Sequence, residues 1–387
     1  MQDTGRLRPA AAATLAALTA VVIVYGSLYP FRFRGALDWR RAATDLLATA
    51  DVLTSRGDLI SNVLLYAPLG FFIAQALARL GYAAVPLAIA AGGLLSVTVE
   101  LLQSDAAFRS SAMSDVYMNL AGSLVGALVG RLAPLARSAR SAEHEPARSF
   151  AGLVLAAWLG WRLYPFVPAL DWQKVKAALK PIVLASELPA LDLFRHFAGW
   201  LAAAVLLEAI AGPHRRRLAF ALLVAGVLAV RCLLVGVALT PAEVAGGGLA
   251  LFAWLFGLAE VERRARVVVL LFAAAIALQS LEPFMLLPQP RPFVWVPFRS
   301  LIVGSTETNV RSFLEKTFLY GALLWLLLRG GARFWPAATG ATAFVLALKW
   351  GQTWLPRRSG EITDVLLVLI LALILRLTSA GPRDSAT

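Results

Sequence analysis

Residues 83–102, AAVPLAIAAGGLLSVTVELL, form an unbroken apolar run that decides what kind of fold the chain adopts. The run contains one ionisable side chain, Glu100. A helix rises about 1.5 Å per residue, so a run of this length reaches across a hydrocarbon core of roughly 30 Å. Eleven further runs of this kind predict an all-α membrane protein with about twelve transmembrane helices. They are Ala10–Ser27, Leu59–Ala78, Val116–Leu132, Phe150–Phe166, Leu193–Ile210, Leu218–Leu239, Ala242–Ala259, Val267–Leu286, Phe313–Leu328, Phe334–Leu355 and Ile362–Leu377.

The composition excludes a soluble domain. Of the 387 residues, 59% are hydrophobic and only 15% are charged, whereas a globular chain carries about a quarter charged residues. Lys and Arg exceed Asp and Glu by 36 to 23, which gives a net charge of +13. The basic residues stand in short clusters between apolar runs, a pattern that orients membrane proteins and argues against a nucleic-acid partner.

Cysteine and histidine are too few for a metal site or a disulfide framework. Cys232 is the single cysteine, and His144, His196 and His214 share no metal-ligand spacing. His196 beside Arg195 on an apolar helix is better explained as a packed or paired residue than as a ligand. We therefore expect no metal and no cofactor.

The basic clusters also predict the orientation. Arg6 and Arg8 precede the first span, and arginine clusters follow the fourth, sixth and eighth spans. Under the positive-inside rule these connections and both termini are cytoplasmic. A cleavable signal peptide is the alternative for the first span, but no small-residue cleavage site follows it, and Tyr29-Pro30-Phe31 comes next. We therefore expect an uncleaved first helix.

A short motif after the first, fifth and ninth spans points to internal repeats. It reads LYPF at residues 28–31, LYPF at 163–166 and LEPF at 281–284, and the first two copies continue into ALDW. The spacing predicts three repeats of four helices each, over residues 1–135, 149–262 and 265–378. The first repeat holds the fullest polar set; in the later repeats His196 stands for Asn62, Trp200 for Tyr66, Glu243 and Asp364 for Asp115, Lys349 for Glu100 and Val368 for Asn119.

The polar residues of the first repeat are predicted to meet at the outer face of the membrane. With alternating helix directions, the start of the second span, the end of the third and the start of the fourth reach the same face. Ionisable groups at membrane depth are costly, which makes them functional candidates. The predicted binding residues are Asp58, Asn62, Tyr66, Glu100, Gln103, Arg109, Asp115 and Asn119.

The side-chain chemistry limits what this pocket binds. Arg109 presents a planar donor fork suited to carboxylate or phosphate. Asn62, Asn119 and Gln103 offer the donors and acceptors that read hydroxyl or amide groups. Carboxylates with an arginine also suit acid/base hydrolysis or a divalent cation, although no diagnostic spacing supports either. The competing interpretation is structural, with polar groups satisfying one another and glycines such as Gly122 allowing close helix approach.

The motif Asp58-x3-Asn62-x3-Tyr66-x-Pro68-x-Gly70, followed by Glu100-x2-Gln103-x5-Arg109-x5-Asp115-x3-Asn119-x2-Gly122-x3-Gly126, resembles the VanZ-like membrane proteins of bacteria. The resemblance covers about Val21–Leu132. It implies a cell-envelope role in the bacterial cytoplasmic membrane, because the founding member is associated with low-level resistance to a lipoglycopeptide antibiotic that acts on cell-wall precursors. It supplies no defined reaction, and the later repeats depart from the motif.

Three functions remain open at this point. The first is binding of the polar head of a lipid-linked or amphiphilic cell-wall molecule, such as a lipid-linked precursor or a glycopeptide-like amphiphile, with membrane lipids as the surrounding partners. The second is a membrane enzyme acting on a lipid-phosphate or a lipid-linked sugar, so enzymatic activity stays undecided. The third is a transporter or flippase, which internal repeats suggest. The polar set lies near one face rather than at the midplane, which places transport last.

Overall fold

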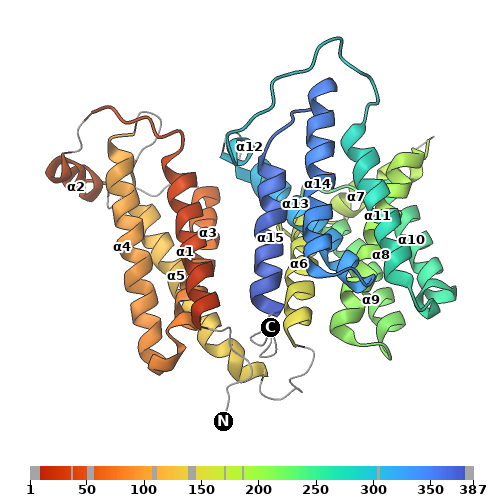
Figure 1. The fold of residues 1–387 in the computed structure, drawn as a ribbon, viewed down its shortest axis with the longest axis horizontal. Helices are drawn as coiled ribbons and strands as arrows, with labels where there is room; N and C mark the ends of the chain where they lie inside the picture. The colour runs from red at the N-terminus through yellow and green to blue at the C-terminus, as the bar shows by residue number, and fades with distance from the viewer. Residues whose placement is uncertain are drawn as a thin grey trace. The chain divides into compact units, whose positions relative to one another are not determined.

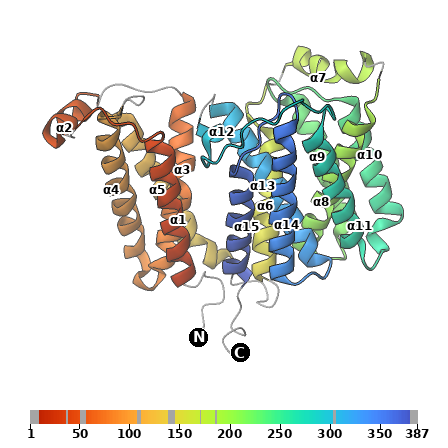
Figure 2. The same ribbon diagram turned by 45° about the horizontal axis from the view of Figure 1, so that its top comes forward.

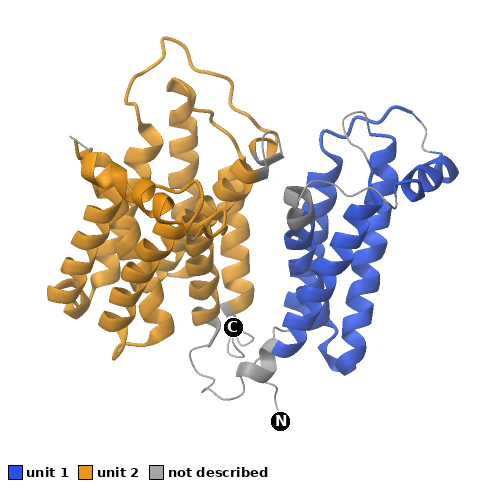
Figure 3. Ribbon diagram, turned by 180° about the vertical axis from the view of Figure 1, so that it is seen from behind, with its two compact units in different colours: residues 1–145, 304–306 blue, residues 146–303, 307–387 orange. Residues whose placement is uncertain are grey.

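The computed structural model describes residues 9–35, 38–49, 56–106, 111–137, 145–169, 171–184, 187–302 and 306–379. Most of these residues are helical. The extended segments among them form only isolated bridges, so the fold is all-α as predicted. The chain divides into two compact units (Figure 3). Unit 1 comprises Met1–Glu145 with Gly304–Thr306, and unit 2 comprises Pro146–Val303 with Glu307–Thr387.

Unit 1 is a bundle of four long helices with a short helix at one end (Figures 1 and 2). The short helix begins where Asp38 accepts hydrogen bonds from the backbone N–H groups of Arg40 and Arg41, and it lies beside α4. The long helices are α1 (Pro9–Leu28), α3 (Arg56–Ala76), α4 (Ala84–Ser104) and α5 (Met113–Arg137), and the short one is α2 (Trp39–Leu47).

Glycines bring α3 and α5 into backbone contact. A Cβ added to Gly122 would lie 2.5 Å from the Val63 carbonyl oxygen, and one added to Gly126 would overlap the carbonyl of Ala67. Gly130, four residues further along α5, is placed in the same way against Phe71. This stripe of small residues explains the close approach of the two helices.

Unit 2 is a larger helical bundle around an aromatic core. Trp158, Trp200, Phe220, Trp254 and Phe318 are almost fully buried in it and form a chain of ring contacts. Its long helices are α6 (Glu145–Leu163), α8 (Ala190–Ala211), α9 (Arg216–Leu233), α10 (Pro241–Phe256), α11 (Arg264–Leu281), α13 (Thr306–Arg329), α14 (Phe334–Gly351) and α15 (Thr363–Ser379). The short helices α7 (Trp172–Leu184) and α12 (Arg299–Ile302) lie at one end of the bundle (Figure 2).

Each of the twelve apolar runs overlaps one of the long helices. Within the described residues, four helical segments are long and apolar enough to cross a membrane: Pro9–Leu28, Ala78–Ser104, Ala190–Ala211 and Arg264–Leu281. Two shorter apolar helices, Asn62–Ala76 and Pro241–Phe256, accompany them. The chain is thus a multi-pass membrane protein, and the crossing of the bilayer by all twelve helices stays a prediction.

One backbone turn occurs three times. After α1, α6 and α11 the chain passes through Phe31, Phe166 and Phe284, whose φ angles are 58°, 62° and 60°. Each phenylalanine N–H donates to the carbonyl three residues earlier, at 2.7–2.9 Å. The same local conformation therefore follows the first helix of each predicted repeat.

Charged side chains pair at the end of unit 2 where α8 meets α9 and α10 meets α11. Glu208 is buried and accepts a hydrogen bond from Arg264 Nε at 2.9 Å, and Glu260 lies 2.7 Å from Arg216 Nη2. The hydrogen bond from Arg216 lowers the pKa of Glu260. These arginines belong to clusters that the positive-inside rule assigns to the cytoplasmic side.

Candidate functional site

Three side-chain hydrogen bonds define one recurring position in the fold. Gln103 Nε2 donates to the carbonyl oxygen of Ser27 at 2.9 Å, and Gln352 Nε2 donates to that of Ser280 at 3.0 Å. Arg231 Nη1 donates to the carbonyl oxygen of Arg162 at 2.6 Å. All three acceptor residues stand three positions before the proline of the recurring turn. Arg231 therefore occupies the position of Gln103.

The acidic residues follow at constant spacing. Asp115, Glu243 and Asp364 each come twelve residues after Gln103, Arg231 and Gln352 respectively, and each lies in the first turn of its helix. Glu243 and Asp364 are the residues predicted as counterparts of Asp115, and Arg231 was not among the predicted residues. The same twelve-residue interval identifies Arg231 as the counterpart of Gln103.

In unit 1, four of the predicted binding residues are buried in the described structure. Glu100 is 3% exposed and accepts a hydrogen bond from the backbone N–H of Ala112 at 2.9 Å, which ties the end of α4 to the start of α5. Asn119 Nδ2 donates to Ser96 Oγ at 2.9 Å. Tyr66 is 1% exposed on α3, and Gln103 holds the end of α1. The end of α4 thus joins α1 and α5 through polar contacts.

The remaining predicted residues are less fully placed. Asn62 on α3 and Asp115 on α5 are half-buried. Arg109 lies outside the described residues, and so does the side chain of Asp58, whose backbone belongs to α3. The meeting of all eight side chains in one pocket therefore stays a prediction. Within the described part, Asn119 Oδ1 and Ser123 Oγ are buried without a hydrogen-bond partner.

In the third predicted repeat, the acidic residue Asp364 lies between two lysines. Asp364 is fully buried and lies 2.7 Å from Lys316 Nζ, and its other oxygen contacts Lys349 and accepts from Tyr320 Oη at 2.8 Å. Lys316 also lies 3.4 Å from Glu361. Two lysines thus face two carboxylates, and the cluster is neutral. Lys349 is directed inward, toward Asp364.

In the second predicted repeat, the acidic residue Glu243 lies between two arginines. Glu243 is 2% exposed; its Oε1 lies 2.9 Å from Arg231 Nε and 3.3 Å from Arg162 Nη2. Arg162 Nη2 also lies 3.3 Å from His196 Nδ1. Both arginines are at least 90% buried, so this buried trio carries a net charge of +1. His196 is a paired residue, as the sequence analysis expects.

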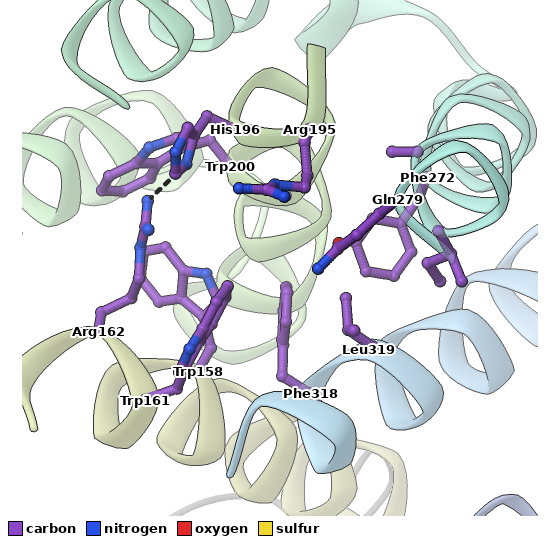
Figure 4. Close-up of a pocket in the computed structure, with 13 residues that line it drawn as sticks. Trp158, Trp161, Arg162, Arg195, His196, Trp200, Phe272, Gln279, Phe318 and Leu319 are labelled. Atoms are coloured by element: carbon purple, nitrogen blue, oxygen red, sulfur yellow. Dashed lines mark hydrogen bonds between the residues drawn. The ribbon is translucent and has the colours of Figure 1, made fainter. Parts of the chain in front are cut away.

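A cavity of about 50 Å³ lies next to Arg162 inside unit 2 (Figure 4). Helices α6, α8, α11 and α13 surround it. It was not predictable from the sequence, because these helices belong to two different predicted repeats. The side chains of Arg195 and Gln279 point into the same space from α8 and α11 (Figure 4). Its walls include Trp158, Trp161, Trp200, Phe272 and Phe318.

Apolar helices with polar clusters gathered between them define a multi-pass helical membrane protein. Residues 9–134 match the VanZ/LLP1 family model, so this part of the chain is a VanZ/LLP1 family domain and lies within unit 1. The match agrees with the resemblance read from the polar motif. No curated protein and no solved structure matches the chain significantly. Among the described residues, no cluster of three or more potential metal ligands occurs.

Proposed function

We propose that the VanZ/LLP1 domain binds the polar head of a lipid-linked or amphiphilic cell-wall molecule at the outer face of the bacterial cytoplasmic membrane. The pocket comprises the ends of α3, α4 and α5 with Arg109 in the connection between α4 and α5. All twelve long helices cross the membrane in this proposal, with both termini in the cytoplasm, and the three repeats are copies of one four-helix plan.

The observation that carries the proposal is a difference in charge between equivalent positions. In each of the later repeats the acid forms ion pairs with two cations. Glu243 pairs with Arg162 and Arg231, and Asp364 pairs with Lys316 and Lys349. Arg162, Arg231 and Lys349 correspond to Ser27, Gln103 and Glu100 of the first repeat. Lys316 corresponds to Asn62, because it stands four residues before Tyr320 as Asn62 stands four residues before Tyr66. None of the four residues in the first repeat is basic. The first repeat therefore has no basic residue at these four positions.

A polar ligand supplies hydrogen-bond donors to the buried acceptors of the first repeat. Burying a carboxylate such as Glu100 without sufficient donors is costly, and Asn119 Oδ1 is a buried acceptor without a partner in the described structure. Hydroxyl, amide or ammonium groups of a headgroup satisfy these acceptors. Arg109 then holds a phosphate or carboxylate of the same ligand.

The test is equilibrium binding to the full chain in lipid nanodiscs. The probe is a polyprenyl-diphosphate-linked disaccharide peptide, and the free polyprenol serves as the headless control. We expect Arg109→Ala and Glu100→Gln each to weaken binding about tenfold or more, which is the effect of losing one buried charged contact. Asp45→Asn, at an exposed acid of α2, is the matched control and keeps wild-type affinity.

Two results contradict the proposal. One is unchanged affinity in both Arg109→Ala and Glu100→Gln when each variant unfolds at the wild-type temperature. The other is equal binding of the free polyprenol. Chemical conversion of the probe during the experiment shifts the conclusion to a membrane enzyme.

A further inference from the structure

The cavity beside Arg162 belongs to unit 2 and is separate from the VanZ/LLP1 domain. It lies near the last turns of α6 and α11 and the early turns of α8, at the end of these helices predicted to face outward. Its size of about 50 Å³ holds a few water-sized groups. A small headgroup fits this space, whereas a sugar does not.

The polar atoms around the cavity are donors with unused capacity. Arg162 is 95% buried, and its Nε has no hydrogen-bond partner in the described structure; the same is true of Trp200 Nε1. Both residues line the cavity. An arginine cannot accept a hydrogen bond, so His196 Nδ1 is the acceptor in its contact with Arg162. A site bordered by free donors is complementary to an anion.

The charges point the same way. Arg162, Arg231 and Glu243 form a buried group with one cation in excess, and a buried charge needs a partner. Two further acids lie near the cavity: Asp192 lies 3.0 Å from Arg195, and Glu315, whose charge also acts on Arg162, accepts from the neutral amide of Gln279 at 3.4 Å. The cationic groups that line the cavity are Arg162 and Arg195.

Aromatic rings form much of the cavity wall. The arginine guanidinium lies over the rings of Trp158, Trp161 and Trp200, with its central carbon 5.4–5.7 Å from their centroids. Phe272 and Phe318 extend the apolar wall along α11 and α13. Because most of these rings are almost fully buried, the cavity takes the charged headgroup beside Arg162, and the alkyl chain extends out of it.

We propose that this cavity is a second binding site, which takes the oxyanion headgroup of an amphiphile, a phosphate or a carboxylate, while the alkyl chain extends out of the cavity. Arg162 is the binding donor. The site does not depend on the function proposed for the VanZ/LLP1 domain.

The experiment measures calorimetric binding of dodecyl phosphate to the full chain in phosphatidylcholine nanodiscs, with empty nanodiscs as the blank. Dodecanol and inorganic phosphate are the two partial probes. Arg162→Met removes the charge and leaves Arg231 paired with Glu243. Gly199→Leu fills the cavity, because Gly199 lines it and an added Cβ meets no atom within 4 Å.

Matched controls come from the same unit. Gly226 on α9 also has open space around an added Cβ but lies outside the cavity lining, so Gly226→Leu reports the effect of a larger side chain alone. Arg376 also lies over aromatic rings, those of Phe334 and Trp335, so Arg376→Met reports the loss of an arginine elsewhere.

We expect saturable binding of dodecyl phosphate that weakens about tenfold or more in Arg162→Met and in Gly199→Leu and is unchanged in both controls. Wild-type affinity in a folded Gly199→Leu protein overturns the proposal. Equal affinity for dodecanol overturns the anionic headgroup, and equal affinity for inorganic phosphate overturns the amphiphile. Because Gly199→Leu leaves every charge in place, the test holds even if Arg162→Met fails to fold.

Discussion

Arg231 holds both carboxylate oxygens of Glu243, with Nε 2.9 Å from Oε1 and Nη2 2.9 Å from Oε2, in the interior of unit 2. The arginine also fastens the end of α6 through the Arg162 carbonyl. One side chain thus links α6, α9 and α10. Where the VanZ/LLP1 domain has the neutral amide of Gln103, the second predicted repeat has a cation and therefore a different charge balance.

This charge balance predicts unequal costs for removing single members of the trio. Glu243→Ala leaves two buried arginines without a counter-ion, and we expect a loss of about 3–5 kcal/mol in the free energy of unfolding. Arg162→Met leaves the neutral Arg231–Glu243 pair and costs less. Denaturant unfolding of both variants in detergent checks the order. Equal losses would show that the excess charge has no energetic role.

The lysine cluster allows a parallel test in the third repeat. Asp364→Asn removes the carboxylate that lies between Lys316 and Lys349, so we expect a loss of about 3–5 kcal/mol in the free energy of unfolding. Lys349→Met keeps the Lys316–Asp364 ion pair and is milder. Thermal unfolding of the two variants side by side measures the difference. A more damaging Lys349→Met would contradict the roles given to these residues.

The contact between α3 and α5 predicts a strong effect of side-chain size at one glycine. In Gly126→Leu the new side chain meets the backbone of Ala67, so the two helices must separate. Overpacking of this kind costs about 3 kcal/mol. Gly26→Leu on α1, where an added Cβ meets nothing within 4 Å, is the control. Similar unfolding temperatures for both variants would argue against the contact.

The single cysteine makes the orientation testable. In a Cys232→Ser background, His214→Cys lies in the connection between α8 and α9, predicted to be cytoplasmic, and Lys176→Cys lies on α7, predicted to be outside. A membrane-impermeant maleimide added to intact cells is expected to label Lys176→Cys alone, and to label both after the membrane is opened. The reverse labelling pattern would invert the topology.

The helices were predictable from the sequence because each apolar run is long enough to identify by itself. The pairing of acids with arginines at the α8–α9 and α10–α11 connections was predictable, because a buried acid such as Glu208 needs a cation and arginines stand near it in the sequence. The polar contacts between α1, α4 and α5 were predictable only as positions near one face. The hydrogen-bond partner of Glu100 depends on the path that the chain takes before α5. The spacing of residues in the sequence does not predict that path.

The site in unit 2 could not be predicted for a different reason. Its residues come from helices of two predicted repeats. Whether these residues come together depends on how the two repeats pack, and the recurring sequence motif of each repeat does not determine that packing. The sequence analysis looked for function where the family motif is complete. Arg162 lacks a counterpart in that motif, because the equivalent residue is Ser27 and contributes only its carbonyl.

The backbone contact along Gly122, Gly126 and Gly130 has a mechanical consequence for the VanZ/LLP1 domain. With no side chains between them, α3 and α5 lack the adjustable layer through which packed helices normally slide past one another. We expect them to move as one piece that carries Tyr66 and Asn119 together. We expect a change of shape in this domain to occur at α1 and α4 instead, which are tied to their neighbours by the hydrogen bonds of Gln103 and Glu100.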